Sequence, residues 1–142
     1  MEQRKLVHTE RIAVRWGDMD AMGHVNNTVY FRYMEQARIC WFESLVPQAE
    51  AWTSLSIVIV NASCNFRRPI NYPGTVEVKV FTGAPGGSSV PTFYELLVKD
   101  ELHADGVEKY ILAIREQFLE TNPGYLTPLA RLRKQSQTET AV

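Results

Sequence analysis

The sequence predicts an α+β domain in which one long helix lies against a single antiparallel sheet. Three observations support this fold class. Only residues 28–45 combine helical spacing of apolar side chains with the length of a full helix. Strand-like segments precede and follow this helix, without the strand–helix alternation that builds a parallel sheet. The chain of 142 residues suffices for one domain with its own core.

The first strand is expected over residues 9–16, where polar and apolar residues alternate and Ile12, Val14 and Trp16 form the apolar side. A polar stretch that contains glycine, residues 17–27, separates this strand from the helix. It is the only long connection in the first third of the chain.

The helix over residues 28–45 is expected to be buried on more than one side, because apolar residues also lie outside its main stripe. Asn26 or Asn27 can cap its first turn, and Pro47 follows its end. The main stripe consists of Tyr30, Tyr33, Met34, Ala37, Trp41 and Leu45. A helix of ~18 residues is ~27 Å long, so a curled sheet can bury it.

Four further strands are expected over residues 56–66, 75–82, 90–99 and 107–119. Turn residues separate them at 71–74, 84–87 and 104–106. The last of these, Ala-Asp-Gly, is a hairpin signal. One domain is therefore expected over residues 1–142, with a polar tail at 131–142.

The composition excludes several classes of protein. A formal net charge of −1 gives no electrostatic basis for nucleic-acid binding, and no apolar run approaches the ~18 residues of a membrane span. Cys40 and Cys64 lie in apolar runs without metal-like spacing, as free thiols of a reducing compartment do. The charged start of the chain argues against a secretory signal, so we expect a cytoplasmic protein.

The chemistry is expected at residues 16–30, where acidic and polar groups stand before the helix. Unpaired N–H groups and the positive end of the helix dipole meet there and favour a developing negative oxygen. Asp20 lies just upstream and can act as nucleophile or general base. Hydrolysis of a thioester requires little beyond this carboxylate and a site for the negative oxygen, because the thiolate leaves without a strong acid. In the alternative interpretation, Asp18 and Asp20 serve only turns and caps.

Other catalytic motifs are missing from the sequence. It has no Gly-x-Ser-x-Gly elbow, no Walker A loop and no Rossmann fingerprint. Asp18, Asp20 and His24 are the best metal ligands available, but three ligands on one flexible turn are a weak set. We expect neither a metal nor a cofactor.

The sequence DMDAMGHVNN at residues 18–27, followed by Tyr30, resembles the signature of the 4-hydroxybenzoyl-CoA thioesterase family of hotdog proteins. Residues 66–70, 72–74 and 86–89 agree more loosely with later segments of the family. The resemblance implies five antiparallel strands around one helix, with homodimers that often pair into homotetramers and a site between protomers. It also implies hydrolysis of an acyl-CoA to acid and coenzyme A, the latter being part of the substrate.

The resemblance also implies the roles of site residues. Asp20 supplies the catalytic carboxylate, and the main-chain N–H of Asn27 polarises the thioester carbonyl. His24 has a secondary role in orienting substrate or water, or serves structure alone. Substrate contacts are expected from Asn26, Tyr30, Arg67, Ser88 and Ser89, although Asn26 can also be only a cap.

Both halves of the substrate remain open, the thiol half because of a departure from the family. Basic residues that hold coenzyme A phosphates in several members are absent from residues 84–89, and Arg67, Arg68 and Lys99 are the nearest candidates. The thiol half can thus be coenzyme A or an acyl-carrier protein. The acyl group is also open, because Met19, Met22, Tyr30, Tyr33 and Trp41 can line a tunnel or form plain core.

Two classes of function remain. The first is an acyl-CoA thioesterase, and the second is a non-catalytic hotdog module that binds acyl-CoA or an acyl-carrier protein. Asp20 favours the enzyme, because a negative charge beside a thioester carbonyl offers nothing to a module that only binds.

Overall fold

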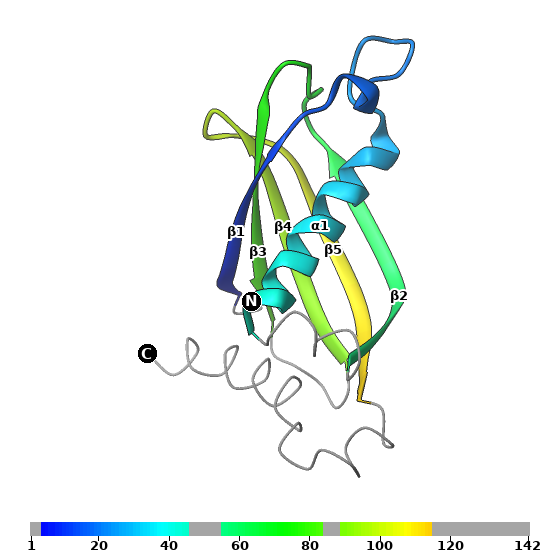
Figure 1. Cartoon of the computed structure of the whole chain (residues 1–142), viewed down its shortest axis with the longest axis vertical. Coiled ribbons are helices and arrows are strands. Elements are labelled where there is room, and N and C mark those ends of the chain that lie inside the picture. The colour runs from blue at the N-terminus through cyan, green and yellow to red at the C-terminus, as the bar shows by residue number, and fades with distance from the viewer. Residues whose placement is uncertain (1–3, 46–54, 84–88, 115–142) are drawn as a thin grey trace.

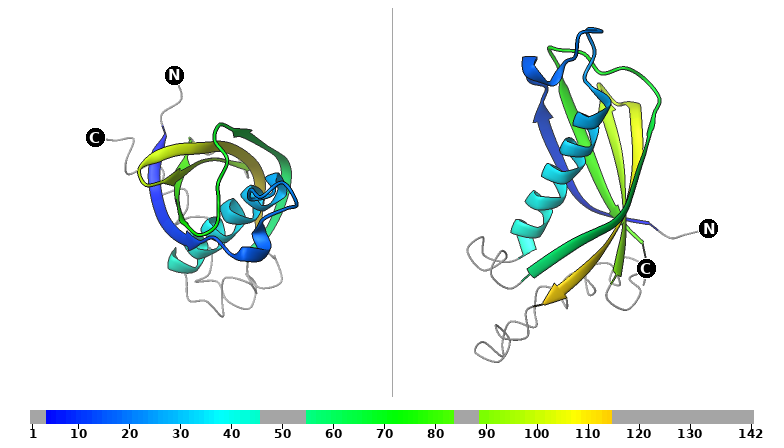
Figure 2. Two further views of the ribbon diagram at one scale, coloured as in Figure 1. Left: turned by 90° about the horizontal axis from the view of Figure 1, so that it is seen from above. Right: turned by 90° about the vertical axis from the view of Figure 1, so that its right-hand side faces the viewer.

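The computed structural model describes residues 4–45, 55–83 and 89–114, and these form one curled sheet around one long helix (Figure 1). The elements are β1 (Lys5–Ala13), η1 (Trp16–Asp18), α1 (Asn27–Leu45), β2 (Leu55–Phe66), β3 (Thr75–Thr82), β4 (Ser89–Val98) and β5 (Glu101–Ile114). The strands pair antiparallel in the order β1-β3-β4-β5-β2. Viewed from above, the sheet bends around α1 (Figure 2), so the predicted hotdog fold is confirmed.

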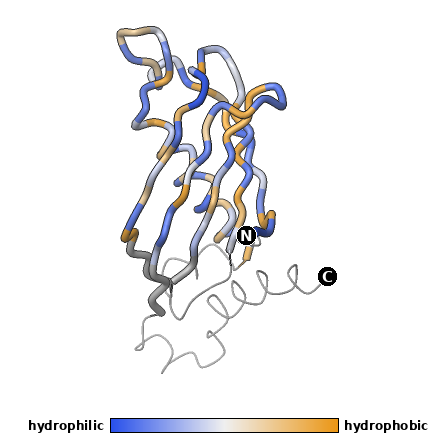
Figure 3. The backbone as a smooth tube through the Cα atoms, turned by 180° about the vertical axis from the view of Figure 1, so that it is seen from behind, coloured by the Kyte–Doolittle hydropathy of each residue, from blue (hydrophilic) through white to orange (hydrophobic). Residues whose placement is uncertain are grey.

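The sheet alternates in character along its strands. On β3, Val76, Val78 and Val80 are fully buried and belong to the core, whereas Glu77 and Lys79 lie on the other face. Figure 3 shows the same alternation of hydrophobic and hydrophilic residues along the strands. This period of two is what a sheet with one covered face requires.

The helix is buried on more than one side, as its sequence predicts. The buried residues of α1 are Tyr30, Tyr33, Met34, Ala37, Arg38, Trp41 and Phe42. Met34 and Ala37 have no exposed surface. The helix begins at Asn27, one residue before the expected start, because Asn26 and not Asn27 is the cap.

The hairpin predicted at residues 104–106 is wrong, since these residues lie inside β5. The chain turns instead at Lys99 and Asp100, which both adopt left-handed backbone angles with φ of 51° and 65°. Gly106 has another reason to be glycine: a Cβ built there would overlap the sulfur of Met34. The glycine lets α1 approach the sheet closely.

The first strand also differs from the expectation. It covers Lys5–Ala13 instead of residues 9–16, and Trp16 lies in the short η1 turn with 73% of its surface exposed. The pairing of β1 with β3 ends at Ala13 and Thr75. Polar and apolar residues keep alternating in the sequence after Ala13, so the pattern predicted a strand that ends too late. The expected tail at 131–142, the turn at 84–87 and the end of the last strand at 115–119 lie outside the described residues.

A charged cluster is buried under the second half of α1. Arg38 Nη1 donates to Glu108 Oε1 at 2.6 Å, and both side chains are less than a tenth exposed. Tyr94 OH donates to the same carboxylate oxygen at 2.5 Å. Burial and the adjacent Glu108 carboxylate raise the pKa of Tyr94, so its hydroxyl remains a donor. The cluster joins α1, β4 and β5, and it fixes which turn of the helix faces these strands.

Replacing Gly106 by alanine should destabilise the fold by about 1–3 kcal/mol, as overpacking of a filled core does. The new methyl would meet Met34, which is fully buried, and would lie 3.1 Å from the main-chain oxygen of Ser63. Gly106→Ala can be compared with wild type by urea unfolding.

Gly17→Ala is the matched control, because nothing lies within 4 Å of the Cβ built there. It should change the free energy of unfolding by less than about 0.5 kcal/mol. Equal effects of the two substitutions would show that the contact between α1 and β5 is not tight.

Candidate active site

The loop between β1 and α1 lies at one end of the curled sheet, where it meets the segment that links β2 to β3 (Figure 1). Two main-chain hydrogen bonds join them. Val14 N–H donates to Gly74 O, and Val25 N–H donates to Ile70 O, each at 2.8 Å. Since Val14, Val25 and Ile70 are buried core residues, the loop is held at both ends by packing as well.

Asp18 fixes the shape of the loop from inside. Its Oδ2 accepts the N–H of Arg15 at 2.9 Å and the hydroxyl of Tyr33 at 2.7 Å. Its main-chain oxygen accepts the N–H of Asn26 at 2.9 Å. Burial, followed by the hydrogen bond to Asp18, raises the pKa of Tyr33 above its ordinary value, so the hydroxyl donates at all moderate pH. The first aspartate of the motif therefore has a structural task.

Asp20, the second aspartate, is exposed. A tight turn carries it: Gly23 N–H donates to Asp20 O at 3.0 Å, and Asp20 N–H donates to His24 O at 2.9 Å. Gly23 has a φ of 81°, which glycine adopts without strain. The Asp20 carboxylate accepts Met22 N–H at 2.9 Å and Asn26 Nδ2 at 3.2 Å. Both oxygens are thus oriented by N–H donors.

Asn26 joins this carboxylate to the helix. Its Oδ1 accepts the N–H of Thr28 at 2.9 Å and the Thr28 hydroxyl at 2.6 Å, as an N-cap does. The Asn27 N–H has no hydrogen-bond partner among the described residues. One asparagine thereby places an exposed carboxylate beside an available N–H at the positive end of α1.

His24 is exposed and reaches the link between β2 and β3. Its Nδ1 lies 2.7 Å from Oδ1 of Asn71. From the sequence, Asn71 is expected only as part of a turn, because nothing there connects residues that are 47 positions apart. Asp20, His24, Asn26 and Asn27 are therefore together in the loop, and Asn71 is added to them.

Tyr30, an expected substrate contact, is only 3% exposed. Its hydroxyl accepts Ile70 N–H at 3.2 Å and lies 3.4 Å from Arg68 O. Its ring meets Phe66 edge-on, with centroids 5.0 Å apart. In this position Tyr30 supports the link that holds the loop between β1 and α1.

The other expected contacts lie elsewhere in the chain. Arg67 pairs with Asp105 at 2.6 Å, on the sheet side of the link. Ser89 opens β4 at the end of the sheet opposite the start of α1 (Figure 1). Ser88 lies outside the described residues. Within one chain, the fold does not bring the start of β4 to Asp20.

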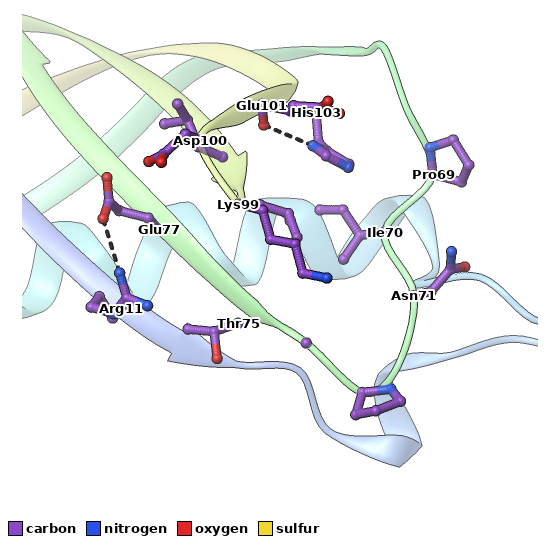
Figure 4. A pocket seen from close by; sticks show the side chains of 14 residues that line it. Arg11, Pro69, Ile70, Asn71, Thr75, Glu77, Lys99, Asp100, Glu101 and His103 are labelled. Carbon is purple, nitrogen blue, oxygen red and sulfur yellow. Dashed lines mark hydrogen bonds and ion pairs between the residues drawn. The ribbon is translucent and has the colours of Figure 1, made fainter.

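A pocket of about 720 Å³ lies on the other side of Asn71, between the link and the β4–β5 hairpin (Figure 4). Arg11 and Glu77 face each other across one wall at 3.1 Å, and His103 Nδ1 is held by Glu101 O at 2.8 Å. The Lys99 side chain enters the pocket from the hairpin (Figure 4). Its ammonium has no polar partner among the described residues.

The described residues contain neither a cluster of metal ligands nor a membrane-spanning helix. No three His, Cys, Asp or Glu side chains converge there as metal ligands. The described part of the chain also contains no helix with the length and apolar character of a membrane span.

Comparison with solved structures identifies similar chains. A proposed thioesterase of Pseudomonas aeruginosa, the PA2801 protein, is 35% identical with a TM-score of 0.72, over 80% of this chain and 88% of that one. A proposed acyl-CoA thioesterase of Xanthomonas campestris is 33% identical with a TM-score of 0.69, over 75% and 92%. A Thermus thermophilus thioesterase complexed with coenzyme A and Zn is 32% identical with a TM-score of 0.67, over 75% and 78%.

Curated sequences give a shorter match. The uncharacterised protein YsmA of Bacillus subtilis is 30% identical over 84 residues, 59% of this chain and 56% of that protein. The chain thus spans little more than half the length of the curated relatives it matches. The sequence profile of the Thioesterase-like superfamily matches residues 14–119, which include the whole loop and all of β2, β3, β4 and β5. The chain belongs to the thioesterase-like superfamily.

Proposed function

We propose that this protein is an acyl-CoA thioesterase that hydrolyses its substrate to a free acid and coenzyme A. One observation carries the proposal: Asn26 holds the exposed Asp20 carboxylate at 3.2 Å while it caps the helix whose Asn27 N–H has no partner within the described chain. A nucleophile or base therefore stands next to a donor for the carbonyl oxygen. Membership of the thioesterase-like superfamily supports the same reaction.

The reaction follows from these atoms. The thioester carbonyl oxygen accepts the Asn27 N–H, and the helix dipole stabilises the negative charge that develops on it. Asp20 either attacks the carbonyl carbon to form an anhydride or takes a proton from an attacking water. The coenzyme A thiolate then leaves. His24, which shares the turn with Asp20, is a second polar group available to water or substrate.

Coenzyme A is the thiol half that the comparisons favour. The Xanthomonas protein is a proposed acyl-CoA thioesterase. The Thermus protein is a thioesterase complexed with coenzyme A and Zn. Arg67 and Arg68 are paired with Asp105 and Glu101, at 2.6 Å and 3.2 Å. Of the three nearest basic candidates for phosphate contacts this leaves Lys99, which has no ion pair among the described residues. A cytoplasmic location stays a prediction.

Asp20→Asn should reduce thiol release from acyl-CoA by about 10²–10⁴-fold, because the substitution keeps the shape of the side chain but removes the nucleophile or base. Thiol release from a panel of short, long and aromatic acyl-CoAs would be measured for both proteins. The preferred acyl group of the panel would also identify the substrate class.

Asp100→Asn is the control, since it removes an exposed carboxylate from the β4–β5 turn, where Asn is well tolerated. It should keep the activity of wild type. If wild type binds acyl-CoA without hydrolysing any member of the panel, the alternative function is favoured: a hotdog module that only binds acyl-CoA or an acyl-carrier protein.

Substitutions of Asn26 separate its two tasks. Asn26→Asp keeps an oxygen for the Thr28 N–H but loses the donor to Asp20 and places a like charge beside it. It should fold with nearly the stability of wild type and lose most activity. Asn26→Ala should lose activity and also about 0.5–2 kcal/mol of stability, because the cap is gone. Urea unfolding and thiol release together test this. Full activity of Asn26→Asp would argue against a role for the contact with Asp20.

We also propose that the active protein is a homodimer, joined through β2, or a homotetramer built from such dimers. β2 is an edge strand of the sheet, with β5 as its one partner among the described strands. Three apolar residues of β2 are between 41% and 49% exposed, namely Ile59, Val60 and Phe66. Long apolar edge strands are usually covered by another chain. A second chain could also bring the start of its own β4 to Asp20, which one chain does not.

Val60→Glu should shift the protein towards monomers in sedimentation experiments, because a charge would be buried at the edge of β2. Leu6→Glu is a control on β1, the opposite edge of the sheet, where Leu6 is 43% exposed. Dissociation by Leu6→Glu and not by Val60→Glu would place the interface on β1 instead.

A further inference from the structure

Three hydrogen bonds join the link between β2 and β3 to the loop between β1 and α1. Two are the main-chain bonds from Val14 to Gly74 and from Val25 to Ile70, which position the loop as a whole. The third joins two exposed side chains, His24 and Asn71, at 2.7 Å. A single exposed hydrogen bond adds little to stability. Its specific effect is on the imidazole, which carries no other hydrogen bond among the described residues.

The contact determines which nitrogen of His24 carries the proton. The Asn71 atom is Oδ1, and an amide oxygen can only accept a hydrogen bond. With Oδ1 of Asn71 facing the ring at 2.7 Å, the matching tautomer of His24 carries its proton on Nδ1. In the neutral imidazole the lone pair is then on Nε2, the nitrogen that Asn71 does not touch. A hydrogen bond to one ring nitrogen fixes both the tautomer and the orientation of a histidine. His24 is therefore a proton acceptor whose free nitrogen points in a fixed direction.

We propose that Asn71 is a positioning residue that keeps His24 in this form, and that Nε2 of His24 accepts a proton from the hydrolytic water. The proposal rests on the thioesterase function and deepens it. His24 and Asp20 belong to one turn, in which Asp20 N–H donates to His24 O at 2.9 Å. The main chain therefore holds the base and the carboxylate in one turn.

The reaction then has two steps. An Asp20 oxygen attacks the thioester carbonyl carbon, the carbon–sulfur bond breaks, and an anhydride and a thiolate result. Water next attacks the acyl carbon of the anhydride while His24 Nε2 takes one of its protons. The carbon–oxygen bond to Asp20 breaks, which releases the carboxylic acid and restores the Asp20 carboxylate. The proton on Nε2 passes to the thiolate or to solvent, so that atoms and charges balance.

The first experiment is to read the protonation of His24 directly, by long-range proton–nitrogen NMR correlation of the imidazole rings. The chain has three histidines, and His24→Gln identifies the signal. Wild type should show a protonated Nδ1 and a bare Nε2. Asn71→Leu, which lacks an acceptor, should lose this preference, and Asn71→Asp should keep it, because a carboxylate also accepts from Nδ1. An unchanged tautomer in Asn71→Leu would overturn the proposal without any reference to activity.

The second experiment is a double-mutant cycle on thiol release. Asn71→Leu should lower kcat about 10-fold with little change in KM, and Asn71→Asp should restore most of it. His24→Gln should lower turnover about 10²-fold or more and show a burst of one thiol per site, because the anhydride accumulates. In the His24→Gln background, Asn71→Leu should have no further effect.

The outcomes separate this proposal from the function on which it rests. If Asn71→Leu and His24→Gln reduce turnover multiplicatively, or if His24→Gln keeps wild-type turnover, the proposed role of the pair is wrong. Asp20→Asn would still abolish activity in either case, so the thioesterase function would stand. If wild type itself releases no thiol from any acyl-CoA, the thioesterase function fails. Melting temperatures of all variants identify any substitution that acts through unfolding alone.

Discussion

The close approach of α1 to β5 is the constraint on which the rest of the structure depends. Met34 has no exposed surface, and a Cβ at Gly106 would overlap its sulfur. A side chain at this point would lift the helix from the sheet, and the start of the helix would move with it. Because the candidate active site is built on that start, the distance between helix and sheet also sets the position of Asn27.

The inner face of the sheet differs between the two halves of the helix. Near the loop between β1 and α1, valines of β3 and the glycine of β5 give a smooth apolar surface. Under the second half, Arg38, Glu108 and Tyr94 form a charged cluster that is almost fully buried. Ion pairs of this kind add little net stability, but they are costly to misalign. The cluster therefore opposes rotation or sliding of α1, which the apolar half alone would permit.

The loop between β1 and α1 is bonded to its neighbours at both ends and exposed at its centre. Main-chain bonds from Val14 and Val25 fasten it to the β2–β3 link, and Asp18 ties it to Tyr33 in the core. Asp20 itself lies in the exposed turn. Two aspartates only two positions apart thus have opposite environments, one used for structure and one facing solvent. This division lets a flexible-looking, polar sequence present a carboxylate in one fixed orientation.

The sequence by itself determined the fold class, the strand over Thr75–Thr82 to the residue, and the gathering of Asp20, His24 and Asn26 before the helix, because these depend on local periodicity and on a contiguous motif. It did not determine the turn between β4 and β5. The Asp-Gly pair at 105 and 106 looks like a hairpin locally, but it lies inside β5, and Met34 occupies the space that a side chain at Gly106 would need. Nor could it show that Asn71 reaches His24, or that the Tyr30 hydroxyl supports the link at Ile70. Such contacts join segments about 40 or more positions apart, and only the packing of the helix against the sheet decided them.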